Sequence, residues 1–105
     1  MADVETPELR RLRRRIDALD RRIVGLLNER ADLARAAGRA KAEAGRQQMR
    51  DADREREVLL RVTMANRGPM PQADLLAVYR RLMAVARTLE ADDLSRNGRE
   101  ATDGD

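Results

Sequence analysis

Apolar residues recur between residues 9 and 40 at intervals that alternate between three and four positions. The series runs through Leu9, Leu12, Ile16, Leu19, Ile23, Leu26, position 30, Leu33, Ala37 and Ala40. This spacing is typical of a long helix that buries one side against other helices. We expect the helix to begin at Thr6-Pro7-Glu8, an N-cap followed by proline and an acid, and to end near Ala44-Gly45. Such a helix is on the order of 55 Å long. Because that is too long for a compact monomer of 105 residues, the pattern predicts a partner chain.

A second helix is predicted after a connection formed by Gly45 to Met49. Asp51 or Asp53 is expected to cap this helix, which ends near Asn66. The segment Arg67–Pro71 then interrupts the helical pattern, because it contains one glycine and two prolines.

A third helix is expected over about residues 72–93, where apolar side chains again recur at helical spacing. The sequence therefore predicts an all-α fold with three helices per chain and a long first helix. Residues 1–7 are expected to form an N-terminal extension and residues 8–93 the helical domain. Residues 94–105 are expected to be a disordered tail, because nothing from Ser95 onward offers a large apolar anchor.

Two cations lie on the apolar side of the first helix. Arg30 occupies a position of the series at which leucine is expected, and Lys41 follows eleven residues later, close to a whole number of turns. A buried charge without a partner destabilises the fold strongly. We therefore expect an anionic side chain or an anionic ligand to meet both cations.

The composition narrows the chemistry that the chain can perform. Cysteine and histidine are absent, which excludes a disulfide framework, histidine-activated nucleophiles and the common Cys/His zinc sites. No cofactor and no metal are expected. The single aromatic residue, Tyr79, and a net charge of only +3 disfavour nucleic-acid binding. No membrane span and no signal peptide are apparent, so a cytoplasmic location is expected.

The second and third helices also carry charged residues at positions where packing would favour apolar ones. Asp51, Arg54 and Glu55 fall in the first turn of the second helix, where backbone N–H groups are free. Glu90 lies on the inner face of the third helix. One interpretation is a buried structural network that pairs the two cations of the first helix with the two glutamates. The other is a polar pocket for a small dianion, in which Glu55 accepts a hydrogen bond from a hydroxyl group.

Four short motifs follow one another in an informative order. They are I-D-x-L-D-x-x-I from Ile16, L-x-x-E-R ending at Arg30, G-x-A-K ending at Lys41, and R-D-x-x-R-E ending at Glu55. In this combination, over about residues 8–92, the sequence resembles the all-helical chorismate mutase family. The resemblance implies an intertwined homodimer in which each long first helix is shared between two bundles.

The resemblance also implies roles for individual residues. Arg13, which in isolation would be an ordinary surface arginine, matches the arginine that each site takes from the partner chain. Arg30 matches an arginine that binds a substrate carboxylate. Lys41 matches the lysine that bridges a carboxylate and the breaking ether oxygen, and Glu90 matches the second contact to that oxygen.

The second helix supplies the remaining positions, and two residues of the third depart from the common pattern. Arg54 matches a supporting arginine, while Glu55 and the backbone N–H of Asp51 match the site of the substrate hydroxyl. Glutamine is common at the position of Glu90, and a glutamate must be protonated before it can donate a hydrogen bond. At Ala86, a hydroxyl residue that often helps to hold a carboxylate is replaced, which implies weaker substrate binding.

The activity implied by the resemblance is the Claisen rearrangement of chorismate to prephenate, without a covalent intermediate. Relatives that act on isochorismate with release of pyruvate, or on an amino analogue of chorismate, remain alternatives within the family. A non-catalytic helical dimerisation module is the alternative outside it. The sequence leaves open whether a partner enzyme of aromatic biosynthesis activates the chain.

Overall fold

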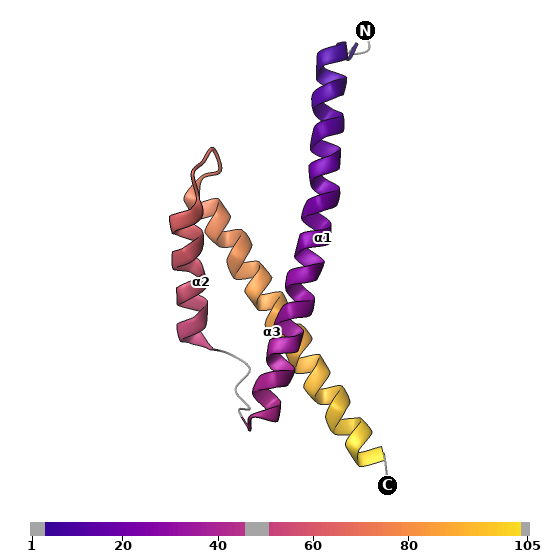
Figure 1. Ribbon diagram of the computed structural model, residues 1–105, viewed down its shortest axis with the longest axis vertical. Helices are drawn as coiled ribbons and strands as arrows, with labels where there is room; N and C mark the ends of the chain where they lie inside the picture. The colour runs from indigo at the N-terminus through magenta and orange to yellow at the C-terminus, as the bar shows by residue number, and fades with distance from the viewer. Residues whose placement is uncertain (1–3, 46–50, 104–105) are drawn as a thin grey trace. The chain divides into compact units, whose positions relative to one another are not determined.

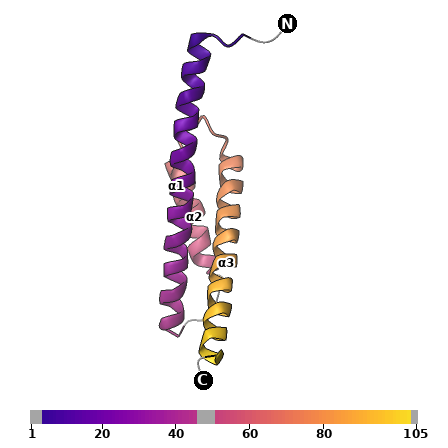
Figure 2. The ribbon, with the colours of Figure 1, turned by 90° about the vertical axis from the view of Figure 1, so that its right-hand side faces the viewer.

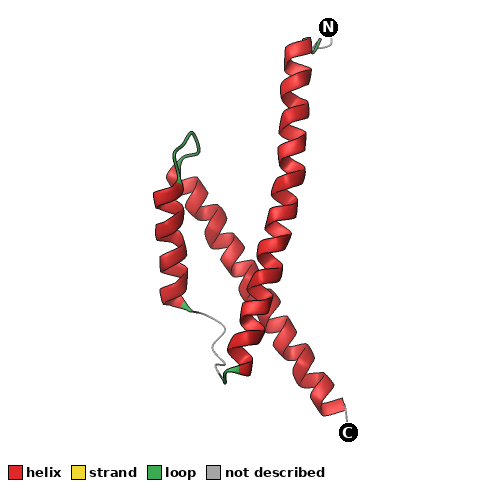
Figure 3. Cartoon of the chain, in the orientation of Figure 1, coloured by secondary structure: helices red, strands yellow, loops and turns green. Residues whose placement is uncertain are grey.

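The computed structural model describes residues 4–45 and 51–103, and within these ranges it contains three helices and no strand (Figure 1, Figure 3). The helices are α1 (Pro7–Glu43), α2 (Ala52–Ala65) and α3 (Gln72–Asp103). The prediction of an all-α fold with a long first helix is therefore confirmed.

The ends of α1 are set by local sequence signals. The Oγ1 atom of Thr6 accepts a hydrogen bond of 3.1 Å from the backbone N–H of Leu9, so Thr6 is the predicted N-cap. Pro7 is the first helical residue. The helix ends at Glu43, and Gly45 follows with φ +81°, a left-handed conformation that favours glycine.

The start of α2 is capped by Asp51, whose side chain accepts a hydrogen bond of 3.0 Å from the backbone N–H of Arg54. Of the two aspartates considered from the sequence, Asp51 is therefore the cap. At the other end, the Asn66 side chain accepts a hydrogen bond from Gly68 N–H and donates one to the Met70 carbonyl. These bonds build the predicted turn between α2 and α3. The predicted connection from Gly45 to Met49 lies almost entirely outside the described residues.

The third helix is longer than predicted. It continues to Asp103, whereas the sequence led us to expect an end near Asp93 and a disordered tail over residues 94–105. That expectation rested on the lack of apolar anchors, which concerns packing and does not by itself end a helix. No proline follows Asp93, and arginine, glutamate and alanine in this segment have good helix propensity.

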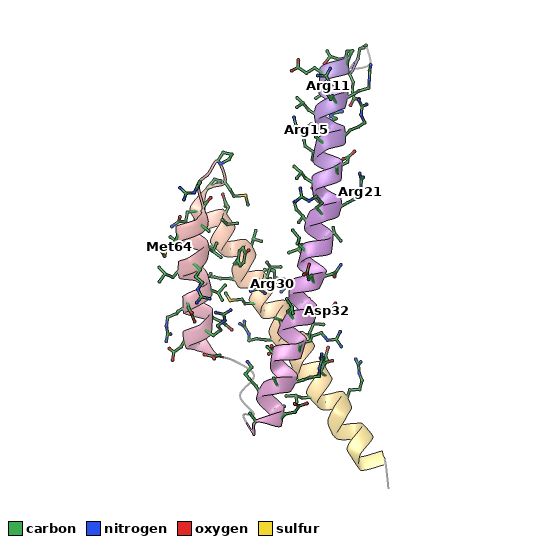
Figure 4. The ribbon with its side chains drawn as sticks, in the orientation of Figure 1. Arg11, Arg15, Arg21, Arg30, Asp32 and Met64 are labelled. Carbon is green, nitrogen blue, oxygen red and sulfur yellow. The ribbon has the colours of Figure 1, made fainter. Side chains whose placement is uncertain are left out.

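The chain divides into residues 1–30 and residues 31–105, and each unit is described by itself. The first unit carries most of α1, from which Arg11, Arg15 and Arg21 project (Figure 4). The predicted apolar positions of this unit form a stripe whose side chains are 37–59% exposed: Leu9, Leu12, Ile16, Leu19, Ile23 and Leu26. Within a single chain, this apolar stripe of α1 is uncovered.

The second unit contains the end of α1, together with α2 and α3. The turn after α2 brings the two later helices back against each other (Figure 1), and the last turns of α1 run beside α3 (Figure 2). Met83 of α3 is buried and lines the space between α2 and α3. On the outer side of α2, Met64 is exposed (Figure 4). The end of α1 and the facing sides of α2 and α3 thus form the frame of the candidate site.

Candidate functional site

Glu90 is a buried carboxyl group on α3, with only 8% of the residue exposed. Burial raises its pKa above the usual glutamate value, because desolvation disfavours the charged form. The positive charges of Lys41 and Arg87 act in the opposite direction, while the negative charges of Asp93 and Glu55 add to the increase. The net effect is a raised pKa, so Glu90 keeps its proton to higher pH than an exposed glutamate.

Lys41 lies in the last turn of α1 and is half-buried. A cation at this position also interacts favourably with the carbonyl groups at the C-terminal end of the helix. Its charge lowers the pKa of Glu90, which places the ammonium group within electrostatic reach of that carboxyl. Lys41 and Glu90 lie far apart in the sequence, and in the structure the lysine charge reaches the carboxyl group.

Three residues predicted to belong to the site, Asp51, Arg54 and Glu55, lie at the start of α2, where Asp51 caps the helix. Because Asp51 holds the backbone N–H of Arg54, and its carbonyl accepts a bond of 3.0 Å from Glu55 N–H, the turn has a defined start. Arg54 itself is exposed and lies 3.5 Å from Glu57. Glu55 is half-buried and points toward α3. Of the three side chains, that of Glu55 therefore belongs to the interior of the unit.

Glu55 is paired with Arg87, a residue that the sequence analysis did not select. The Nη1 atom of Arg87 donates a hydrogen bond of 2.5 Å to Oε2 of Glu55. Glu55 therefore has a partner on α3, and its pairing with a cation of the first helix, considered from the sequence, stays a prediction. The sequence could have indicated Arg87, because it follows the buried Met83 by four residues and precedes Glu90 by three. This spacing places all three residues on the same face of the helix.

A cavity of about 220 Å³ lies between α2 and α3 beside this pair. Glu55 and Arg87 line it together with the apolar side chains of Leu59 and Met83. Four of the seven residues that line it are charged, namely Glu55, Arg56, Arg80 and Arg87, so this cavity is more polar than most sites for small molecules.

Asp93 forms a second charged cluster, one turn beyond Glu90 on α3. Arg35 donates to it through Nε and Nη2, each at 2.9 Å, and Nη1 of Arg39 lies 3.7 Å away. The hydrogen bonds and charge of Arg35 hold the pKa of Asp93 below its usual value, with Arg39 acting in the same direction. This cluster, which the sequence analysis also missed, joins the end of α1 to α3.

Arg13 and Arg30 lie in the unit formed by residues 1–30. Arg13 is exposed and forms an ion pair with Glu5 at the start of the chain. Arg30 is half-buried on α1. The grouping of these two arginines with Lys41 and Glu90, which was predicted from the sequence, stays a prediction.

Over residues 4–45 and 51–103, the structure contains neither a cluster of metal-binding side chains nor a membrane-spanning helix. No group of three or more acidic side chains is arranged there to hold a metal ion. None of the helices described in these ranges is long and apolar enough to cross a membrane.

The sequence and fold of the chain are similar to those of known proteins. Residues 12–91 match the family described as chorismate mutase type II. The chain belongs to this family. A solved chorismate mutase (form II) from Thermus thermophilus is similar in fold, with a TM-score of 0.75 and 31% sequence identity. The similarity covers 80% of this chain and 94% of that one, so the chorismate mutase fold accounts for most of both molecules.

The curated relatives of this chorismate mutase domain are larger proteins. A bifunctional chorismate mutase/prephenate dehydratase from Aquifex aeolicus is 37% identical over 87 residues, which are 79% of this chain and 24% of the relative. The protein of the same description from Stutzerimonas stutzeri is 33% identical over 90 residues, with 82% and 25% covered. The chain thus spans about a quarter of the length of these relatives, and the similarity concerns one part of each.

Proposed function

We propose that this chain catalyses the rearrangement of chorismate to prephenate. The observation that carries the proposal is the buried Glu90, within electrostatic reach of Lys41, in a chain of the chorismate mutase type II family. In this reaction one C–O bond breaks and one C–C bond forms in a single cyclic shift of electrons, with no proton transfer. It therefore needs neither a nucleophile nor a base, which fits a chain without cysteine or histidine.

Lys41 and protonated Glu90 are the proposed catalytic residues. Negative charge grows on the ether oxygen as the C–O bond lengthens, and two donors directed at this atom bind the transition state more tightly than the substrate. One preorganised donor of this kind typically contributes on the order of 3 kcal/mol, or about a hundredfold in rate. The raised pKa of Glu90 supports its role, because only the neutral acid can donate.

The remaining predicted residues are proposed to bind and orient the substrate. Arg13 and Arg30 would each hold one of its two carboxylates, so that the side chain lies over the ring in a geometry close to the transition state. Glu55 and the backbone N–H of Asp51 would bind the ring hydroxyl, with Arg54 as a supporting cation. Support for this assignment comes from the position of Glu55, which lines the cavity between α2 and α3.

The functional form is proposed to be a homodimer in which each site takes Arg13 from the partner chain. The uncovered apolar stripe of α1 supports this proposal, because six large aliphatic side chains at helical spacing form a surface suited to a second helix. A second copy of the same chain presents the same stripe, so a two-fold pairing would cover both.

The experiment that tests the function follows purified chorismate in the presence of the protein at several pH values, with products separated by chromatography. Formation of prephenate, slowed about a hundredfold in a Lys41→Ala variant, would support the proposal. Conversion only of isochorismate, with release of pyruvate, or only of the amino analogue would move the assignment within the family. A protein inert to all three substrates would be a non-catalytic dimerisation module.

A further inference from the structure

Gly38 of α1 is packed directly against the side chain of Glu90. Gly38 is buried, and a Cβ atom built on it would lie 2.7 Å from Cγ, 3.1 Å from Cδ and 3.3 Å from Cβ of Glu90. The first of these distances is too short for two carbon atoms that are not bonded to each other. The side chain of Glu90 therefore occupies space that is open only because residue 38 lacks a side chain.

The backbone does not explain a glycine at this position. Gly38 lies within the helix, in contrast to Gly45 and Gly68, which have φ values of +81° and +72°. Glycine in a helix interior is less stable than alanine. Gly25 lies in the same helix, and a Cβ atom there would meet nothing within 4 Å. The close approach of Glu90 is thus a property of Gly38, and Gly25 provides a matched comparison.

A side chain at residue 38 would displace Glu90 rather than separate the helices. Arg35 and Arg39, which flank Gly38 on α1, both lie against Asp93, one turn beyond Glu90 on α3. These contacts fix the spacing of the two helices next to the crowded point. The flexible part of the contact is the Glu90 side chain, so its carboxyl group would have to adopt another rotamer.

We propose that Gly38 is a positioning residue, whose bare Cα forms the wall that holds the Glu90 carboxyl group in its buried orientation. The positioning itself follows from the packing, whereas its consequence for catalysis rests on the proposed function. A displacement of about 1 Å in a catalytic group can lower a rate about a hundredfold. A single methyl group at residue 38 is therefore expected to reduce kcat while KM changes little.

The first test compares Gly38→Ala with Gly25→Ala. Gly25→Ala should raise Tm by a few degrees, through helix propensity alone, and leave kcat unchanged. Gly38→Ala should lower Tm and reduce kcat by about tenfold or more, with KM within about threefold of the original value. If Gly38→Ala behaved like Gly25→Ala in both measurements, the proposal would be overturned.

A second test does not depend on activity. In a Glu90→Ala background the Cγ and Cδ atoms that crowd residue 38 are absent, so Gly38→Ala should no longer lower Tm. An unchanged loss of Tm in that background would show that Gly38 is required for another reason and would sink the positioning role. Should the original chain fail to convert chorismate, this comparison would still decide the positioning role, while the proposed function would fall separately.

The carboxyl group also offers a spectroscopic readout. The charged groups that face Glu90 are Lys41 of α1, Glu55 of α2, and Arg87 and Asp93 of α3. NMR titration of carboxyl-labelled glutamate, with the Glu90 signal assigned from its loss in Glu90→Gln, measures the pKa directly. Gly38→Ala should move this pKa toward the value of an exposed glutamate, because the displaced group regains solvent. An unchanged pKa would contradict the proposal.

Discussion

Arg35 of α1 binds both carboxylate oxygens of Asp93 of α3, with two hydrogen bonds of 2.9 Å from a single guanidinium group. The two residues are 58 positions apart in the sequence. A bidentate pair of this kind fixes orientation as well as distance, because a planar donor fork meets a planar acceptor. It therefore holds the end of α1 against α3 next to the buried Glu90.

Replacement of Asp93 by asparagine should weaken the fold in a pH-dependent way. The pKa of Asp93 is lowered in the folded chain, so its contribution to stability is present above the usual aspartate pKa and disappears as the pH falls through the folded value. We expect Asp93→Asn to lower Tm by a few degrees at neutral pH and by progressively less in acid. Thermal melts over this pH range provide the measurement. The neighbouring exposed Asp92→Asn is the control, and equal effects of the two variants would contradict a specific role for the pair.

The local parts of this arrangement could be predicted from the sequence. Thr6 and Asp51 act within one turn of their own helices, so capping rules were sufficient to identify them. Glu90 was also identified, because a charge among apolar residues at helical spacing departs from the pattern. These predictions needed only distances along one helix.

Contacts between helices could not be predicted in the same way. Whether Glu55 meets Arg87, and whether Gly38 meets Glu90, depends on where the helices cross and how each is rotated. Helical periodicity shows which side of a helix is turned inward, but it does not show which residues of another helix contact that side. The functional candidates were therefore predicted as a set, whereas their closest neighbours required the structure.

Arg87→Met should impair both the fold and the binding of the substrate. The change leaves Glu55, which is half-buried, without the hydrogen bond of 2.5 Å that it accepts from Arg87. The loss of such a charged hydrogen bond corresponds to about 1–2 kcal/mol of unfolding free energy. We also expect a higher KM, because Glu55 would no longer be held beside the cavity.

Chemical denaturation and steady-state kinetics measure these two effects. The control is Arg61→Met, which removes an exposed arginine paired with Glu57 within one helix and should change stability by less than about 0.5 kcal/mol. If both variants lost the same stability, the pair between Glu55 and Arg87 would have no special role.

Lys41→Ala should reduce kcat by about a hundredfold without unfolding the chain. The ammonium group lies at the end of α1 and is half-buried, so its removal leaves the helix packing in place. Initial rates and a thermal melt are required together. A kcat close to that of the original chain, with an intact fold, would contradict the proposed stabilisation of the ether oxygen.

Glu90→Gln should make activity less dependent on pH. In the original chain the donor is the neutral acid, so kcat should fall as the pH rises through the raised pKa of Glu90. Glutamine donates a hydrogen bond at every pH. The stability of the fold should also fall as the pH rises. A group whose pKa is raised in the folded state contributes stability at low pH, and this contribution is lost as the pH rises through that pKa. Profiles of kcat and Tm against pH test both statements, and an unchanged kcat profile in the variant would remove Glu90 from the mechanism.

The proposed sharing of Arg13 between chains predicts that two inactive variants restore activity when they are mixed. In an Arg13→Ala homodimer both sites lack the arginine, and in a Lys41→Ala homodimer both lack the lysine. A mixed dimer has one site with Lys41 from the first chain and Arg13 from the second, while its other site lacks both.

Random reassociation makes half of the dimers mixed, and half of their sites complete, so about a quarter of the original activity should return. The two variants must be unfolded and refolded together, and refolding each variant alone is the control. Light scattering should give a mass near twice the 11.9 kDa of one chain. If each chain used its own Arg13, the mixture would remain as inactive as its components.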